Sequence, residues 1–475
     1  MLRKLINSFL VLPLSLYISP QKAVLSETKN HIDEILQEKE DEIFLDYSEI
    51  KKIILDNNQE LNSLKELVSA STFNLSSKIA KKYPSLDLQA SGLPKYVFGK
   101  YYNSNTQTTK TSQFSANPSL NFRWDLIDPL RGSEIKIAKD NYEIAKNNYE
   151  IKRKDLIQEA RARYHRYQKS HQDIKNKKFS VDLSITLLKD AQSKFNAGIG
   201  TKFEVLEADA QLSRDNQSLN EKKIQHEINK ISLKEILNIK EAIDIKKEQR
   251  LTGYWNHKLN KNINDGFEKN LSLKNIYLKK SIKQNQANNY INASKPNIYI
   301  SNTFSSSFSK GDSLSVDIDS SKSGSSYTNT ISLNFAWNIF NGGQNRNSFK
   351  SSNAEAQAEE YSFNNLKNVL KTNISKAYLN LKLNEEKILS SLKEIASTRE
   401  SLRLSKLRYD VGISTLKDVL VIQKELSNAK SKNIDAIYNY NLNLDELERL
   451  TFLQISNNCL KNDTNNIESI CDIQI

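Results

Sequence analysis

The chain of 475 residues has few of the residues that break helices or crosslink a fold. It contains 12 glycines, 7 prolines and 2 cysteines, whereas an average protein has roughly 7% glycine and 5% proline. This scarcity argues against a loop-rich all-β fold, and two cysteines exclude both a disulfide scaffold and a cysteine zinc cluster. The mean hydropathy of −0.62 excludes a protein built from many membrane-spanning helices.

Long apolar runs are absent except at the N-terminus. A basic start, Met1 to Lys4, precedes residues 5–18, which are almost wholly apolar. This order is typical of a secretory signal, so we predict a signal peptide at residues 1–26 and an exported protein. The alternative is an N-terminal membrane anchor. The rest of the sequence contains no stretch of about 20 consecutive apolar residues.

The chain is basic, with 69 lysines and arginines against 56 acidic residues and a formal net charge of +13. A basic balance can indicate a nucleic-acid partner. An export signal argues against that partner, and mixed charge on coiled helices is usually a solvated face. We therefore expect no nucleic-acid partner.

Glycine and proline are also unevenly distributed. Neither occurs within 133–197, 201–252 or 344–411, or after Gly412. Because both residues destabilise helix interiors, these gaps permit helices of more than 60 residues, about 90–100 Å long. Helices of this length need a partner along their whole length.

Apolar residues in two of these gaps recur every seven positions. The two series are Tyr167, Ile174, Val181, Leu188 and Phe195, and Leu381, Ile388, Ile395, Leu402 and Tyr409. A strict seven-residue repeat keeps one seam against a neighbouring helix and favours a left-handed coil. The alternative is a set of ordinary amphipathic core helices.

The two series differ by a constant 214 positions, and the similarity extends beyond them. Residues 195–201 align with 409–415, and with an offset of 213 residues 120–125 align with 333–338. We predict a first repeat at 45–240, a connecting segment at 241–270 that reads as a loop, a second repeat at 271–450 and a C-terminal tail at 451–475. Each repeat is expected to contain a helix, a strand pair and a long helical hairpin.

Each repeat contains a segment with strict alternation of apolar and polar residues. Leu120 to Leu126 and Ile331 to Ile339 both follow it and contain Trp124 and Trp337. Period two predicts strands, with partner strands at about 85–98 and 297–309 and polar tips at 101–112 and 310–327. Such strands suit either a half-buried soluble sheet or an outer-membrane strand between lipid and a wet lumen.

Four strands are too few for a closed barrel in a single chain, since such barrels start at about eight strands. An open sheet edge is not tolerated in lipid. Two chains would supply eight strands and three would supply twelve. We favour three chains, because the interior of an eight-stranded barrel is filled by side chains.

The duplicated plan resembles the TolC-like outer-membrane efflux protein family over nearly all of the mature chain. The residues that carry the resemblance are the strand ends Asn121 to Leu126 and Asn334 to Gly343, and the turns Lys194 to Gly198 and Arg408 to Gly412. The resemblance implies a mainly α fold with a β-barrel portion, in which a homotrimer forms a 12-stranded transmembrane barrel in the outer membrane. A helical tunnel would continue through the periplasm to a periplasmic adaptor protein and an inner-membrane pump.

Candidate working residues lie at the turns. In a tube of repeated subunits, one carboxylate per repeat forms a ring, and acidic rings select cations. Glu204 and Asp418 hold equivalent positions, six residues after each turn glycine. By resemblance they match the family's acidic ring at the periplasmic entrance, and Tyr409 matches a tyrosine that bonds the neighbouring acid, here Glu204. Alternatively, both acids are helix-start residues favoured by the helix dipole, and Tyr409 is a core residue.

The sequence departs from the family pattern near the second turn, where Ser414 replaces an arginine and Val421 replaces a second acid. Both departures weaken the expected acidic ring and the expected bond of Tyr409 to Glu204, which in the family helps to hold the entrance shut. The turns themselves, with Gly198, Thr201, Gly412 and Thr415, are the expected adaptor contacts, and Trp124 and Trp337 mark the barrel end.

We expect no enzymatic activity, no cofactor and no metal site. His165 and His171 stand six residues apart, which does not place two ligands on one helix face. The predicted function is an outer-membrane duct of a tripartite efflux or type I secretion system. The alternative is a structural coiled-coil envelope protein. The sequence does not identify the cargo.

Overall fold

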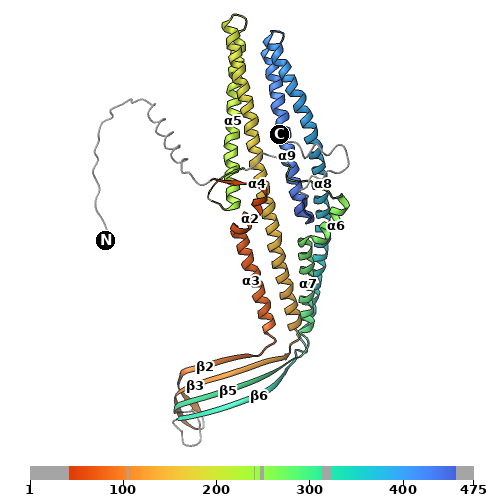
Figure 1. The fold of residues 1–475 in the computed structure, drawn as a ribbon. Helices are drawn as coiled ribbons and strands as arrows, with labels where there is room; N and C mark the ends of the chain where they lie inside the picture. The colour runs from red at the N-terminus through yellow and green to blue at the C-terminus, as the bar shows by residue number, and fades with distance from the viewer. Residues whose placement is uncertain (1–41, 104–105, 240, 246–250, 313–322, 456–475) are drawn as a thin grey trace, which may run out of the picture.

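Two long helical hairpins form the body of the protein. In the computed structural model, which describes residues 42–103, 106–239, 241–245, 251–312 and 323–455, helix α4 (Arg131–Asn196) turns into α5 (Lys202–Leu237). Helix α8 (Gln344–Asp410) turns into α9 (Leu416–Thr451) in the same way. With 66 and 67 residues, α4 and α8 confirm the prediction of helices longer than 60 residues. Figure 1 shows both turns at the same end of the molecule.

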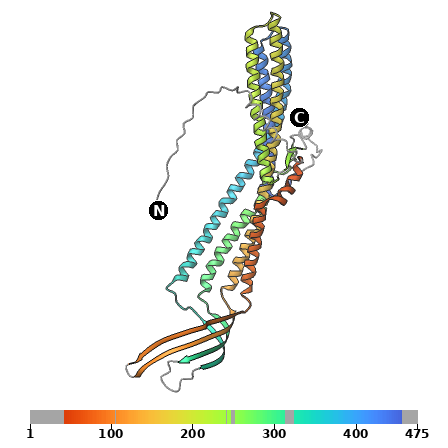
Figure 2. The ribbon, with the colours of Figure 1, turned by 90° about the vertical axis from the view of Figure 1, so that its left-hand side faces the viewer.

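Shorter helices extend each hairpin toward the other end. Helix α3 (Gln59–Ala80) packs on the lower half of α4, and α7 (Leu271–Asn292) packs on α8 and α4. Helix α3 lies beyond the end of α5, and α7 lies beyond the end of α9 (Figures 1 and 2). The body is therefore a bundle in which α4 and α8 run almost its full length.

A small lateral layer surrounds the middle of the bundle. It consists of α2 (Tyr47–Asn57), α6 (Leu259–Lys269) and the parallel pair of β1 (Glu42–Leu45) and β4 (Ala242–Ile245). The expectation of a simple loop between the repeats is wrong, because residues 242–245 and 259–269 form a strand and a helix. Trp255 of this segment is buried in the core of the second repeat.

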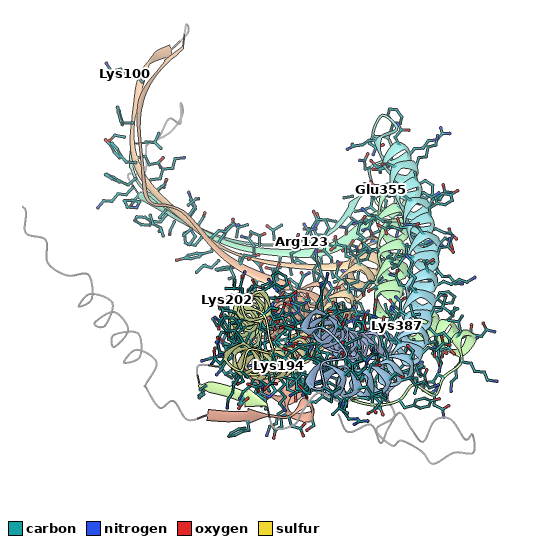
Figure 3. The ribbon with its side chains drawn as sticks, turned by 90° about the horizontal axis from the view of Figure 1, so that it is seen from above. Lys100, Arg123, Lys194, Lys202, Glu355 and Lys387 are labelled. Atoms are coloured by element: carbon teal, nitrogen blue, oxygen red, sulfur yellow. The ribbon has the colours of Figure 1, made fainter. Side chains whose placement is uncertain are left out.

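The four remaining strands form one antiparallel sheet in the order β2-β3-β5-β6. Their bounds are β2 (Ser85–Asn103), β3 (Thr106–Ile127), β5 (Asn297–Asp312) and β6 (Ser323–Ala336). The strands β3 and β5 join the two repeats, with Leu120 opposite Phe304. In the described part of the chain the outer edges of β2 and β6 have no partner strand. The sheet forms an arc beside the bundle, as the end view in Figure 3 shows.

The strands are longer than the sequence predicted. Residues 101–103 and 106–112 continue β2 and β3, so the expected polar tip at 101–112 is mostly strand. In the second hairpin β6 begins at Ser323, and residues 313–322 lie outside the described residues. Paired polar residues near the tips carry no alternation of hydrophobicity, which is why their strand character is not visible in the sequence.

One face of the sheet is apolar and exposed. Cross-strand neighbours Leu333 and Ile300, and Leu120 and Leu88, point to this face. Leu333 keeps 71% of its surface exposed. An exposed apolar face that extends across four paired strands marks a contact with lipid or with another chain.

The predicted heptads form much of the core. Tyr167 and Val181 of the first series, and Leu381, Ile388 and Leu402 of the second, are buried within the chain. Buried clusters link α4 with α5 and α8 with α9, and a third cluster joins both hairpins near the turns. Among the described residues no helix is both long and apolar enough to cross a bilayer.

Candidate channel entrance and membrane joint

The first hairpin turn is built by a left-handed glycine followed by a capping box. Gly198 has φ +76°, a conformation that favours glycine. Three residues later Thr201 caps α5: the Glu204 N–H donates to Thr201 Oγ1 at 3.2 Å, and the Thr201 N–H donates to Glu204 Oε2 at 3.2 Å. The Glu204 carboxylate is thereby held at the start of α5, beside the turn.

The second turn repeats this construction. Gly412 has φ +78°, and Thr415 and Asp418 form a capping box on α9. Asp418 Oδ2 accepts from the Thr415 N–H at 3.0 Å and from the hydroxyls of Thr415 and Ser414, each at 2.8 Å. These bonds, the backbone N–H first, lower the pKa of Asp418 below its usual range. Asp418 is therefore an exposed, ionised carboxylate at neutral pH.

Both acids thus serve their own helices, as the helix-start alternative expects. That role does not consume their charge, because a capping carboxylate remains ionised. The sequence carries the pattern of a capping box, Thr-x-x-Glu and Thr-x-x-Asp, which identifies this role directly. The structure places Glu204 and Asp418 at the same end of the bundle, next to the two turns.

Tyr409 is a core residue at the last turn of α8. Only 2% of its surface is exposed. Its buried hydroxyl has no hydrogen-bond partner among the described residues, so the expected bond to Glu204 is not formed within this chain. Burial, and next the Glu204 charge, raise the pKa of Tyr409 to about 12.

Lys194, which sequence reasoning missed, connects the two hairpins at Tyr409. Its ammonium donates to the Tyr409 carbonyl at 2.6 Å and lies 3.5 Å from the centroid of the Tyr409 ring. Lys194 belongs to the last turn of α4 and Tyr409 to the last turn of α8. The contact therefore ties the tip of the first hairpin to the tip of the second. Figure 3 shows Lys194 over the end of the bundle.

The turn tips also expose apolar side chains that sequence reasoning did not single out. Ile199 and Ile413 follow the two turn glycines and are 78% and 70% exposed. They hold equivalent positions in the two repeats, and Phe203 and Val411 beside them are also exposed. Isoleucine beside a turn glycine is not required by turn chemistry, and the duplicated pair leaves apolar surface exposed at both tips.

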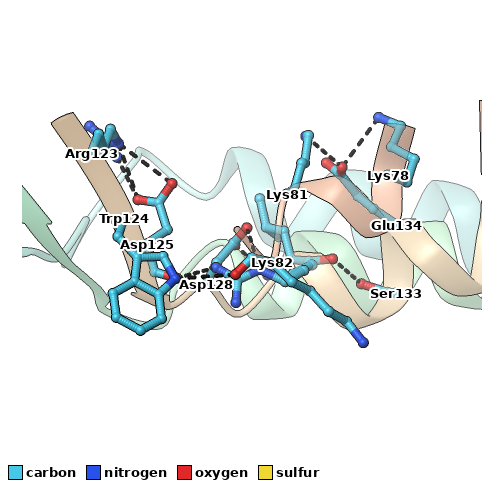
Figure 4. Close-up of polar contacts among 11 residues, drawn as sticks. Lys78, Lys81, Lys82, Arg123, Trp124, Asp125, Asp128, Ser133 and Glu134 are labelled. Atoms are coloured by element: carbon cyan, nitrogen blue, oxygen red, sulfur yellow. Dashed lines mark hydrogen bonds and ion pairs between the residues drawn. The ribbon is translucent and has the colours of Figure 1, made fainter. Parts of the chain in front are cut away.

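At the opposite end, the two tryptophans tie the strands to the helices. Trp124 Nε1 donates to the Lys82 carbonyl at 3.1 Å, and Trp337 Nε1 donates to the Ser294 carbonyl at 2.8 Å. Both acceptors lie just after the helix that precedes the strand pair. The rings themselves stay partly exposed. Both tryptophans therefore lie at the joint between sheet and bundle, and Figure 4 shows Trp124 and Lys82 at the first of the two joints.

Around this joint the first repeat is charged. Lys78 and Lys81 bind Glu134 at 3.3 and 2.8 Å (Figure 4). Arg131 lies 4.0 Å from Asp128. The equivalent positions in the second repeat are uncharged: Tyr290, Ala293, Asn347, Gln344 and Asn341. The second joint instead contains Gly342 and Gly343, both with positive φ.

A buried polar cluster links α2, α4 and α9 at mid-height. Asp445 accepts from the Tyr47 hydroxyl at 2.6 Å and from Arg161 Nη1 at 3.2 Å, and its second oxygen lies 3.2 Å from His165 Nε2. The side chains of Asp445 and His165 are each 1% exposed. Sequence reasoning considered His165 only as a metal ligand. The described residues contain no group of three or more His, Cys, Asp or Glu that could hold a metal ion.

Paired long hairpins that end in a curved sheet make up the fold of this chain. Three solved structures share the fold. The Campylobacter jejuni CmeC outer membrane channel has 16% identity and a TM-score of 0.69, covering 85% of each chain. The Vibrio cholerae outer membrane protein VceC has 14% identity and a TM-score of 0.70, covering 85% of this chain and 96% of VceC. CusC has 14% identity and a TM-score of 0.71, and the match covers 86% of this chain and 93% of CusC.

The family model described as "Outer membrane efflux protein" matches residues 52–238 and 278–451. The chain belongs to this family and is an outer-membrane efflux channel, which confirms the TolC-like resemblance and the predicted mainly α fold. No protein of curated function matches the chain in sequence. The predicted signal peptide at residues 1–26 lies outside the described residues.

Proposed function

We propose that three copies of the chain close a 12-stranded barrel in the outer membrane and continue it as a helical duct across the periplasm. The unpaired edges of the four-stranded sheet carry this proposal. Unpaired strand edges are not tolerated in lipid, so β2 must pair with β6 of a neighbouring copy. Three arcs of four strands make a twelve-stranded wall with its exposed apolar face toward lipid.

Exposed apolar stripes on the helices support the same assembly. Ile224, Ile228 and Ile231 lie on one face of α5, and Leu379 and Leu383 lie on α8; all are exposed in the single chain. Residues spaced by three and four form one helix face, and a long apolar face needs a partner. A second copy supplies one for each stripe.

The duct opens at the turns, far from the sheet. Glu204 and Asp418 stand there in every copy, so a trimer carries six carboxylates around its periplasmic entrance. Such a ring concentrates cations and repels anions. We place the gate at this entrance, with Tyr409 and Lys194 at the contact between the hairpin tips.

Removing both carboxylates should reduce cation selectivity. The double variant Glu204→Gln and Asp418→Asn keeps acceptor groups for both helix caps and removes two charges per chain. We expect its reversal potential under a salt gradient to lose most of the cation-selective shift, measured in planar bilayers. The control, Glu235→Gln, removes an exposed acid near the far end of α5. Equal reversal potentials for the double variant and the unchanged protein would rule out the ring.

The turn tips are the proposed contact for a periplasmic adaptor, and through it for an inner-membrane pump. The exposed pair Ile199 and Ile413 supports this, because it lies at the end farthest from the sheet. The chain would then pass cargo from the pump through the periplasm and the outer membrane.

A photoreactive amino acid at position 199 or 413 should capture a periplasmic adaptor in intact cells, detected as a shifted band and identified by mass spectrometry. The control is position 361, an exposed tyrosine in the part of α8 nearer the sheet. Capture at the control position but at neither turn would contradict docking at the tips.

A further inference from the structure

A pocket of about 90 Å³ lies between α2, α4 and α9, beside the buried polar cluster. Its wall contains five cationic side chains: Lys51, Arg153, Lys154, Arg161 and Arg449. Asp445 and Glu448 are the two carboxylates that line it. Nothing in the channel function described above uses this pocket.

The arginines of the pocket already have carboxylate partners. Arg161 Nη1 binds Asp445 at 3.2 Å and Glu448 at 2.5 Å, so it engages both carboxylates of the wall. Arg153 binds Glu150, outside the wall, at 2.7 Å. Arg161 therefore neutralises part of the charge of both acids in the pocket.

The lysines have no such partner. Arg449 is paired with Asp155, but in the described part of the chain neither Lys51 nor Lys154 forms an ion pair. The Lys154 ammonium lies 4.0 Å from the centroid of the Phe452 ring. Two positive charges of the pocket therefore have no ion-pair partner among the described residues.

The local energetics point the same way. Burial, and next the charge of Arg153, lower the pKa of Lys154, and the nearby Glu448 charge offsets only part of this effect. Arg161 Nε is buried and has no hydrogen-bond partner among the described residues. An oxyanion in the pocket would compensate the ammonium and can accept from such a donor.

We propose that this pocket binds a phosphate-type oxyanion, either free phosphate or the phosphate group of an ester. The cavity has room for a group of this size, since a water molecule occupies about 30 Å³. Guanidinium and ammonium groups together are the usual ligands of phosphate in proteins. Because α2 and α4 belong to the first repeat and α9 to the second, the anion joins the two halves of the chain.

Isothermal titration of inorganic phosphate into the detergent-extracted full-length protein tests this site, at constant pH and ionic strength with chloride as the background anion. We expect saturable binding that Lys154→Gln and Lys51→Gln each weaken by about tenfold, the effect of one charged hydrogen bond. The control, Lys169→Gln, removes another α4 lysine that binds Asp435 of α9 at 2.8 Å and should leave the affinity unchanged.

Helical circular dichroism of each variant shows whether it is folded, and two independent lysine variants guard against one that is not. Glycerol 3-phosphate as a second titrant distinguishes the sources: tighter binding than phosphate indicates an ester ligand, and weaker binding indicates the free ion. No saturable heat with either titrant, or equal weakening in Lys169→Gln, would overturn the site. The result does not depend on whether the protein conducts ions.

Discussion

Asp445→Ala is expected to lower the free energy of unfolding by about 3–5 kcal/mol, the cost of breaking a buried ion pair by removing one partner. Asp445 accepts a hydrogen bond from Tyr47 and pairs with Arg161, lies 3.2 Å from His165 Nε2, and is almost fully buried. Its loss leaves the Arg161 charge with only Glu448 and leaves the Tyr47 hydroxyl without its acceptor. Chemical denaturation followed by the helical circular dichroism signal measures the effect.

Asp435→Ala is the matched control. Asp435 also lies on α9 and binds an α4 cation, Lys169, but its side chain is 53% exposed. Exposed pairs contribute less than about 1 kcal/mol. The double variant Asp445→Ala and Arg161→Met should recover part of the loss, because it also removes the uncompensated charge. Equal effects of Asp445→Ala and Asp435→Ala would show that the buried cluster does not hold α4 to α9.

Lys194→Met is expected to raise the open probability of the channel by roughly ten- to a hundredfold. Its ammonium binds the Tyr409 carbonyl and lies over the Tyr409 ring. A charged hydrogen bond and a cation–π contact together contribute on the order of 2–4 kcal/mol. We expect part of this interaction energy to be present only in the closed state, where the hairpin tips are in contact. Removing the Lys194 ammonium then shifts the equilibrium toward the open state. Single-channel recording measures the open probability.

Lys202→Met provides the control for that variant. Lys202 lies beside the same turn, but its ammonium is 5.7 Å from the centroid of the Phe195 ring, within its own hairpin. It therefore does not tie one hairpin to the other. If both variants changed the open probability equally, net charge at the entrance would explain the effect and the link between the tips would not.

Much of the fold was visible in the sequence because it depends on local rules. Long intervals without glycine and proline predicted α4 and α8, and the seven-residue spacing of Leu381, Ile388 and Leu402 placed them in a buried seam. Alternation predicted the inner parts of the strands. The strand ends were missed because their residues are polar on both faces, and β4, with four residues, is too short to show alternation. Helix α6 does carry a helical pattern, since Leu259, Ile263 and Phe267 recur every four residues and pack on the core of the second repeat, but it is short, and sequence reasoning interpreted the segment only as a connection.

The site was only partly predictable. The turn glycines and the two acids have sequence patterns that repeat at a fixed offset. The link from Lys194 to Tyr409 ends on a backbone carbonyl, and any residue has one, so no side-chain pattern announces it. The bond from Tyr47 to Asp445 spans 398 positions, and only the packed helices bring its partners together. The ring at Glu204 and Asp418 remains a prediction.

Planar-bilayer conductance of the detergent-extracted protein, with its mass determined in the same preparation, tests the central claim most directly. A trimer that inserts and gives discrete, cation-selective openings is the result expected of three arcs that close one barrel around an acidic entrance. A protein that is trimeric yet never conducts would contradict the duct and favour a structural coiled-coil role in the envelope.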